Sequence, residues 1–397
     1  MPTANIVSRA SPPVLIDVTR LVGRLMRGRL PTGVDRVGLE YVRHFSRSAR
    51  AVVRMKSLHQ VLSESASRQL FESLLAPSEK FAWKAGWLIG RQCFRIPGSS
   101  AMKGAFLFNT GHSGLERRDY SITLQKQGVL PLFFVHDLIP ITHPEYCRAG
   151  ERDRHIRRMN TVLHLARGII ANSQATVDEL RQYAATIRRA MPPSIVAPLA
   201  PAVLPLPSGD RPIATPYFVA LGTIEPRKNH LLLLQVWKRL VEQLGTNAPK
   251  LVIIGQRGWD YENVANMLDR CEILRGSVIE CNSCGDRELS TFLHHAQALL
   301  FPTFVEGYGM PLAEALSLGV PVVASDLPVF REIAGEIPDY VDPLDALRWQ
   351  ERVLDYAEAQ SSRRAAQVAR MPDFRRSTWA EHLNTVDSFL EHLRGQA

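Results

Sequence analysis

The sequence predicts an α/β protein built from two doubly wound, mostly parallel sheets, and three observations lead to this prediction. Short apolar stretches alternate with helical patterns along both halves of the chain, as expected of parallel sheets. A Pro-rich stretch, Pro201–Thr215, separates the two series and has the composition of a linker. A chain of 397 residues is also too long for one typical core, so two domains are expected.

The first half opens with Val14–Thr19, an apolar run that predicts a buried strand. The basic stretch Arg20–Thr32 is predicted to be a loop, and a helical period begins at Val34. Phe81–Leu88 holds two tryptophans and is interpreted as core, with an interfacial patch as the alternative. The further strands expected here are Ala105–Asn109, Pro131–Val135, Gly168–Asn172 and Ile195–Leu199, and the further helices are Ser63–Leu75, Arg148–Leu165 and one that begins at Gln174.

The second half repeats the pattern. Its expected strands are Tyr217–Leu221, Leu251–Ile254, Val278–Cys281, Ala298–Phe301 and Val320–Ala324. Helices are expected from Asn229 to about Leu244 and over Pro311–Leu318. The tail Trp379–Leu393 has helical periodicity but no sheet to join, so we expect it to pack back on the first domain. The predicted division is 1–205 and 216–375 for the two domains, 206–215 for the linker and 376–397 for the C-terminal helix.

Composition narrows the class of partner and compartment. The net charge is +9, and basic proteins associate with nucleic acid, anionic membrane surfaces or acidic substrates. Because no nucleic-acid-binding pattern is present, a membrane surface or a phosphate-rich substrate is favoured. The start of the chain has no apolar segment of secretory type and no stretch long enough to span a bilayer, so a cytoplasmic protein is expected, peripheral at the inner face of the membrane.

Five cysteines, an odd number, fit a reducing compartment better than a disulfide framework. Cys281 and Cys284 form a lone C-x-x-C motif. No second Cys or His pair follows at zinc spacing, and the adjacent His294 and His295 do not match a standard site. We therefore expect neither a metal site nor a cofactor.

Polar residues gather where the strands of the first half end. In doubly wound sheets, ligands bind beyond the carboxyl ends of the strands. A predicted helix begins just after Gly33, and its free backbone N–H groups suit a phosphate or an acceptor hydroxyl. The residues at these ends are Gly33, Asn109, His112, His136, Asp137 and Asn172.

The stretch after the first strand of the second half predicts a diphosphate site. Arg227 and Lys228 follow Gly222 and stand just before a helix, where two cations join the positive helix end. Two exposed basic residues at a helix start would be the ordinary alternative. Because their charge would oppose the helix dipole there, the functional interpretation is favoured.

A strand–loop–helix–strand unit, Phe301–Asp326, carries two carboxylates eight positions apart. Glu306 lies in the predicted loop, which contains Gly307 and Gly309, and Glu314 lies in the first turn of the helix that Pro311 begins. A loop and a helix N-terminus can place both carboxylates around one concave spot, which suits a ligand with hydroxyls and phosphates. An ordinary α/β connection with two exposed acids is the alternative.

Together these segments resemble the retaining glycosyltransferases of family 4, which have the GT-B fold of two Rossmann-like domains facing a cleft. The match rests on Gly222 with Glu225-Pro226-Arg227-Lys228-Asn229, on Glu306 and Glu314 within EGYGMPLAEA, and on His136-Asp137. It covers the second domain closely and the first loosely. One departure is the loop PTGVDRVG in place of a glycine-rich loop, which resembles a subset of bacterial polysaccharide-assembly transferases.

The resemblance implies roles for individual residues. Arg227 and Lys228 would hold the leaving diphosphate, Glu314 the ribose hydroxyls, and His136 would contact the donor sugar. Glu306 and the backbone amides of Gly307–Met310 would touch the sugar ring. The implied catalytic set is His136, Arg227, Lys228 and Glu306. The implied donor site is Gly222, Arg227, Lys228, Glu306, Gly307, Tyr308, Gly309, Met310, Pro311 and Glu314, and the acceptor side is Gly33, Asn109, His112 and Asp137.

The implied activity is metal-independent transfer of a hexose, with mannose from GDP-mannose favoured, from a nucleotide-sugar to a saccharide or lipid-linked saccharide in bacterial surface polysaccharide synthesis. Asp137 is the nearby carboxylate and is interpreted as structural rather than as a nucleophile. Two alternatives stay open. One is an epimerase or phosphorylase on the same fold, and the other is a non-catalytic subunit that binds a sugar nucleotide.

Overall fold

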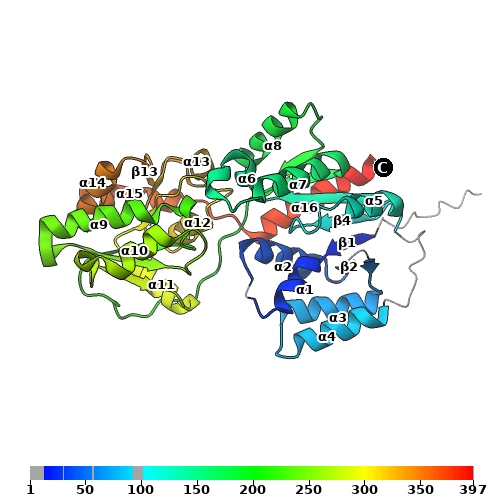
Figure 1. The fold of residues 1–397 in the computed structure, drawn as a ribbon, viewed down its shortest axis with the longest axis horizontal. Coiled ribbons are helices and arrows are strands. Elements are labelled where there is room, and N and C mark those ends of the chain that lie inside the picture. The colour runs from blue at the N-terminus through cyan, green and yellow to red at the C-terminus, as the bar shows by residue number, and fades with distance from the viewer. Residues whose placement is uncertain (1–12, 30, 56–57, 93–101, 397) are drawn as a thin grey trace, which may run out of the picture.

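The computed structural model describes residues 13–29, 31–55, 58–92 and 102–396, which form two α/β domains side by side (Figure 1). The expectations for the start of the chain rest on residues outside these ranges. Within them, every helix is too short or too polar to span a bilayer. The predicted fold class is confirmed.

The first domain contains a seven-stranded sheet in the order β3-β2-β1-β4-β5-β6-β7. All neighbouring strands are parallel except β2 and β3, which form an antiparallel edge. The strands are β1 Val14–Asp17, β2 Ala49–Met55, β3 Leu58–Val61, β4 Phe106–Asn109, β5 Leu130–Val135, β6 Gly168–Ala171 and β7 Ser194–Val196. The helices are α1 Thr19–Leu25, α2 Gly33–Phe45, α3 Glu64–Leu75, α4 Phe81–Gln92, α5 Arg118–Gln127, α6 Ile139–Thr142, η2 Pro144–Tyr146, α7 Glu151–Leu165 and α8 Gln174–Thr186.

The second domain has a six-stranded, wholly parallel sheet in the order β10-β9-β8-β11-β12-β13. Its strands are β8 Tyr217–Leu221, β9 Lys250–Ile254, β10 Val278–Cys281, β11 Leu299–Phe301, β12 Val322–Ser325 and β13 Asp339–Val341. Its helices are η3 Pro226–Lys228, α9 His230–Leu244, η4 Gly245–Asn247, α10 Glu262–Arg270, η5 Glu272–Leu274, α11 Asp286–His295, α12 Met310–Ser317, α13 Pro328–Ala334, α14 Ala346–Ala357, α15 Ser362–Arg370 and η6 Met371–Asp373.

Each sheet is covered on both faces by helices, which gives each domain two layers of buried apolar side chains. The last helix, α16 Trp379–Gly395, returns to the first domain and lies against α2 (Figure 1). There the Tyr41 hydroxyl lies 3.1 Å from His382 Nε2 in a buried contact. Phe389 and Leu393 also pack on Gly168, where a Cβ would come within 2.8 Å of either side chain.

Two expectations for the first domain were wrong. Helix α1 occupies part of the stretch predicted as a loop, with Leu21 and Val22 buried. Helix α1 is stabilised by a charge from another helix, because Arg20 and Arg24 each lie 2.8 Å from the buried carboxylate of Asp35 on α2. The second wrong expectation concerns α4.

On α4, one face is buried in the core as expected, but its tryptophans are not. Phe81, Ala85 and Leu88 are buried, whereas Trp83 is 72% exposed and Trp87 is 46% exposed. The tryptophans are two and six positions after Phe81, which places them off the stripe that Phe81, Ala85 and Leu88 form at helical spacing. The interfacial alternative therefore describes these two side chains better than core does.

Candidate active site

A cleft of about 350 Å³ lies between the two domains and contains charged residues from both. Its walls are Asp137, Ile139, Pro140, Tyr146, Cys147, Arg148 and Glu151 from the first domain and Glu225, Arg227, Trp259, Glu306 and Gly307 from the second. A larger hollow of about 630 Å³ lies between the end of α11 and α15, entirely within the second domain. We assign the site to the interdomain cleft, because loops that follow strands of both parallel sheets meet there.

The chemical centre of the cleft is an ion-pair cluster on η3 and the loop after β11. Glu306 Oε1 lies 2.6 Å from Arg227 Nη1 and 2.6 Å from Lys228 Nζ. Glu225 adds a second carboxylate, 2.6 Å from Arg227 Nε. Two cations and two carboxylates therefore face one another here; Arg227, Glu225 and Glu306 line the cleft, whereas the buried Lys228 does not.

The backbone fixes this cluster locally. The Arg227 carbonyl accepts from the Phe304 amide at 2.8 Å and from the Thr303 hydroxyl at 2.9 Å, which ties η3 to the loop that carries Glu306. Gly222 has φ +136°, and a Cβ there would lie 3.3 Å from Lys228 Cε. The glycine thus leaves room for the lysine side chain to reach Glu306.

Burial and charge oppose each other within the cluster. Burial would raise the pKa of Glu306, but Arg227 and Lys228 outweigh it and hold that pKa below its usual value. Burial lowers the pKa of Lys228, and Glu306 offsets part of this effect. Burial also acts to lower the pKa of Arg227, yet Glu306 and Glu225 raise it overall. The carboxylates thus keep Arg227 charged in a site with little water.

The glycine-rich loop after Glu306 is also the junction between the domains. A Cβ on Gly307 would come within 2.4 Å of the His136 carbonyl oxygen, so only glycine lets the two segments approach this closely. The Gly307 carbonyl accepts from the hydroxyls of Ser173 at 3.2 Å and Thr176 at 3.3 Å, at the start of α8. His136-Asp137 and the Glu306 loop are therefore in direct contact.

Tyr308 points away from the cleft. Its buried hydroxyl donates to the Leu199 carbonyl at 2.7 Å, and its ring joins the core of the first domain. Burial raises its pKa to about 12. Tyr308 does not line the cleft. Gly309, with φ +112°, is the N-cap residue of α12, and a Cβ there would lie 2.6 Å from the Phe330 ring. Met310 and Pro311 follow as the first residues of α12, and Met310 packs against the first-domain core.

The structure does not bring Glu314 into the cleft with Glu306. Glu314 lies in the second turn of α12, not the first as expected, and does not line the cleft. It is buried, which raises its pKa, while Arg36 on α2 and the Ala202 backbone act in the opposite direction. The two carboxylates thus have different surroundings. Glu306 contacts the cations of η3, whereas Glu314 interacts with Arg36 of the first domain.

Of the residues expected from the first domain, Asp137 lines the cleft and the others do not. His136 and His112 are buried and bond to the carbonyls of Thr110 at 2.7 Å and Phe134 at 2.8 Å. Asn109 is buried and donates to the Ser113 carbonyl and the Tyr120 hydroxyl. Gly33 is exposed at the start of α2.

Sequence reasoning missed several residues that the structure places at the cleft. Trp259 donates to Glu225 at 3.2 Å, and the Tyr146 ring stacks on Phe304 of the other domain at 5.0 Å. Cys147 lines the cleft, but burial raises the pKa of its thiol to about 11, so it is a poor nucleophile at neutral pH. Glu225 lies two residues before Arg227. An acidic residue this close to the basic pair was the sequence feature that could have indicated an ion-pair partner for Arg227.

Glu179 on α8 was also missed. It is half-buried, and burial together with Asp137 raises the pKa of its carboxyl to about 7. Perturbed carboxyl groups of this kind concentrate at functional sites. No sequence pattern marks it, because its partner Asp137 is distant along the chain.

Comparisons with known proteins relate part of the chain to a family. Residues 209–364 match the family described as glycosyl transferases group 1. The serotype-specific mannosyltransferase WbdA of Escherichia coli is 28% identical over 231 residues, which is 54% of this chain and 28% of WbdA. The O-antigen chain mannosyltransferase RfbU of Salmonella typhimurium is 31% identical over 140 residues, which is 34% of this chain and 37% of RfbU. The matched region is thus well under half the length of these relatives.

Solved structures share the fold at low sequence identity. HepE of Anabaena, in complex with UDP and glucose, superposes with a TM-score of 0.66 at 13% identity and covers 96% of this chain and 100% of HepE. The α,α-trehalose-phosphate synthase (UDP-forming) of Burkholderia vietnamiensis superposes with a TM-score of 0.62 at 11% identity and covers 98% and 100% of the two chains. Residues 209–364 thus match a glycosyl transferases group 1 domain, and the chain as a whole shares the two-domain fold of these solved structures.

Proposed function

We propose that this chain is a retaining, metal-independent glycosyltransferase that moves a hexose, mannose from GDP-mannose, to a saccharide or lipid-linked saccharide in bacterial surface polysaccharide synthesis. The observation that supports this most is the Arg227–Lys228 pair at the interdomain cleft, within the group 1 domain. The mannose donor is inferred from the relatives, which are named as O-antigen mannosyltransferases.

In the proposed reaction the bond between the sugar C1 and the diphosphate oxygen breaks, and a bond from C1 to the acceptor oxygen forms on the same face. The acceptor proton passes to an oxygen of the departing diphosphate. Negative charge develops on that diphosphate, and preorganised cations in a poorly hydrated site stabilise it more than water would. Arg227 and Lys228 supply this charge, so the step requires no metal ion.

Glu306 and Glu225 hold the cations in position before the donor binds. Because carboxylates accept hydrogen bonds from sugar hydroxyls, Glu306 can exchange one cation contact for the donor sugar once the diphosphate arrives. The opposite wall of the cleft carries Asp137, Arg148 and Glu151, and we assign the acceptor to that side. Burial and Asp137 raise the pKa of Glu179 to about 7, so a protonated Glu179 can accompany a charged Asp137 near neutral pH.

The test is a panel of GDP-, UDP-, dTDP- and ADP-sugars, scored by donor hydrolysis and by thermal stabilisation, with and without EDTA. One nucleotide class should both stabilise the chain and turn over in EDTA, and Arg227→Ala and Glu306→Ala should lose turnover. Arg239→Ala, an exposed arginine on α9 outside the cleft, is the matched control and should keep it. Binding without turnover would favour the non-catalytic subunit, and dependence on free orthophosphate would favour a phosphorylase.

We further propose that the first domain rests on an anionic membrane surface through α4. Several arginines of the first domain are paired, since Arg154 and Arg158 contact Glu116 and Arg20 contacts Asp35. On α4, by contrast, the exposed Trp83 and Trp87 share a helix with Lys84 and Arg91, and Arg91 stacks on Trp87 at 4.6 Å. Exposed tryptophans next to cations suit the boundary between headgroups and acyl chains.

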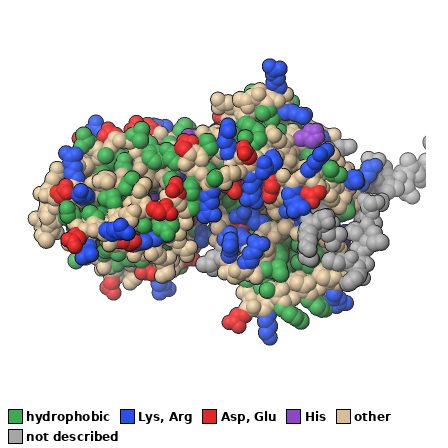
Figure 2. Space-filling model, viewed as in Figure 1, with side chains coloured by type: hydrophobic (Ala, Val, Ile, Leu, Met, Phe, Trp, Pro, Cys, Tyr) green, Lys and Arg blue, Asp and Glu red, His purple; other side chains and the backbone are tan. Residues whose placement is uncertain are grey.

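On the face shown in Figure 2, Lys and Arg side chains gather where the two domains meet. That position is consistent with a site that receives a diphosphate, because a surface rich in one sign of charge attracts the opposite sign.

A further inference from the structure

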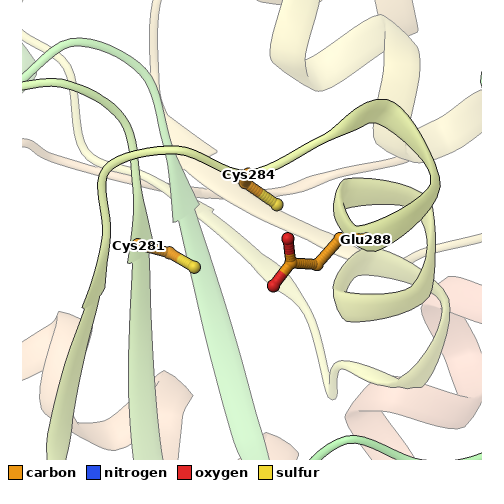
Figure 3. Close-up of side chains that lie close together, drawn as sticks. All are labelled: Cys281, Cys284 and Glu288. Carbon is orange, nitrogen blue, oxygen red and sulfur yellow. The ribbon is translucent and has the colours of Figure 1, made fainter.

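Three side chains that can bind a metal converge at the end of β10, on the edge strand of the second sheet. The ligand atoms of Cys281, Cys284 and Glu288 all lie within 4.8 Å of one another. In Figure 3 the two thiols and the carboxylate point into one shared space between β10 and α11. The cleft assigned above does not include any of these residues.

Local structure explains why they meet. Cys281 is the last residue of β10, and the chain turns through Cys284 before α11 begins at Asp286. Helical side chains lean toward the N-terminus of their helix, so Glu288 in the first turn of α11 reaches back over the turn. The Gly255 amide donates to the Cys281 carbonyl at 3.1 Å, which anchors the base of the turn to the neighbouring strand.

Burial and the neighbouring carboxylate both act on the two thiols of this group. Burial and the nearby Glu288 raise the pKa of Cys281, and the same two effects raise that of Cys284 to about 12. Among the residues that the structure describes, Glu288 pairs with no Lys or Arg. A divalent ion would change this, because thiols lose their protons when they bind a metal.

Ligand type and spacing both fit zinc. Zinc is bound by thiolates at about 2.3 Å and carboxylates at about 2.0–2.2 Å, so two sulfurs of a tetrahedral site stand ~3.8 Å apart. The three atoms found here need to move together by roughly an ångström or less to reach that geometry. A disulfide between the two cysteines would give Glu288 no role, whereas a metal site uses all three side chains as ligands.

We propose that Cys281, Cys284 and Glu288 bind one thiophilic divalent cation of the zinc class, with solvent as the fourth ligand. The sequence analysis expected no metal site, because it searched for Cys and His partners and not for a carboxylate from the next helix. The site stabilises the sheet edge near the donor cleft. Gly255, which is tied to Cys281, packs so closely on Gly222 that a Cβ there would lie 2.0 Å from the Gly222 carbonyl oxygen.

The experiment uses the full chain, reduced and stripped with a chelator, and titrates it with Co²⁺ as a spectroscopic stand-in for zinc. Wild type should bind one equivalent with thiolate-to-cobalt absorption that Zn²⁺ abolishes, and binding should weaken as pH falls because protons compete for the thiolates. Cys281→Ser and Cys284→Ser should lose the absorption. Glu288→Gln, an exposed position where folding is not at risk, should bind at least about tenfold more weakly, because even outer partners of metal ligands matter by about 10–100-fold.

Matched controls lie nearby on η5 and its boundary. Cys271→Ser and Glu272→Gln remove the same chemical groups outside the cluster and should bind cobalt as wild type does. Thermal melts establish that each variant is folded. The proposal is overturned if the reduced wild type shows no cobalt–thiolate absorption. That result would mean that the two cysteines do not bind a metal and would leave a disulfide pair as their role. Equal affinity of Glu288→Gln and wild type would overturn it as well.

Discussion

Replacing Glu306 with glutamine removes one negative charge from between two cations and leaves the shape of the side chain almost unchanged. In the free chain Glu306 Oε1 contacts Arg227 and Lys228 at 2.6 Å each, and the exposed fractions of the three side chains are only 9%, 22% and 8%. The variant therefore tests whether the negative charge of Glu306 stabilises the two cations in the folded chain.

The cost can be worked out from these contacts. Removing one partner of a buried ion pair costs about 3–5 kcal/mol, because it leaves an uncompensated charge. Because the glutamine oxygen still accepts from both cations, and Glu225 still pairs with Arg227, the free energy of unfolding should fall by less than this, by about 2–3 kcal/mol. For a domain of this size that lowers the melting temperature by roughly 5–10 °C.

Adding a nucleoside diphosphate should reverse part of this loss. In Glu306→Gln the two cations lack one counter-charge, so GDP or UDP should raise the melting temperature more than it does in wild type. The assay is thermal unfolding with and without the diphosphate, with Glu242→Gln on α9 as the control. Glu242 is 49% exposed and pairs with Lys238 at 3.8 Å, so its loss should change stability by no more than about 0.5 kcal/mol. The reasoning fails if Glu306→Gln melts like this control, or if the diphosphate stabilises it less than wild type.

Three further outcomes follow from contacts described above. Tyr308→Phe leaves the buried Leu199 carbonyl without its donor, so denaturant unfolding should show a loss of about 1–3 kcal/mol, and an unchanged midpoint would contradict this. Burial lowers the pKa values of His112, His136 and His155, so the unfolded chain binds more protons in acid than the folded chain does. The free energy of unfolding should therefore be at its full value above the unfolded pKa of about 6.5 and should fall as the pH drops below it. A free energy of unfolding that stays constant from about pH 7 to pH 5 would contradict this. Trp83→Ser with Trp87→Ser should weaken sedimentation with anionic liposomes at low salt, relative to the exposed control Ile122→Ser on α5, and equal sedimentation would remove α4 from the membrane proposal.

The sheet architecture was predictable because its signals are local. Each buried strand of a parallel sheet reads as a short apolar run, and Gly, Asn or His marks where it ends. Helix α1 was missed because its stabilising partner, Asp35, comes from another helix, and a run of arginines looks like a loop without it. Strand β2 and the edge strand β3 were missed for a related reason. Two arginines interrupt the apolar run of β2, and the pairing with β3 is not visible along the chain.

The candidate site divides in the same way. Arg227 and Lys228 could be recognised because they are adjacent, and Glu306 contacts both. The surroundings of Tyr308, Glu314 and His136 could not be predicted, since their neighbours are the Leu199 carbonyl, Arg36 and the Thr110 carbonyl, all distant in sequence. The roles of these residues in donor binding stay predictions.

The return of α16 to the first domain means that the chain crosses between the domains twice, once after Ala202 and once before Thr378 (Figure 1). Two domains joined by one connecting segment can rotate about any axis. When two segments connect them, the easiest rotation is about the line that joins the two crossing points. The Gly307–His136 contact lies at the same junction. Opening the domains about this line would therefore separate Gly307 from His136 and pull on the segment that carries Glu306, so a change in domain orientation would loosen the cation cluster.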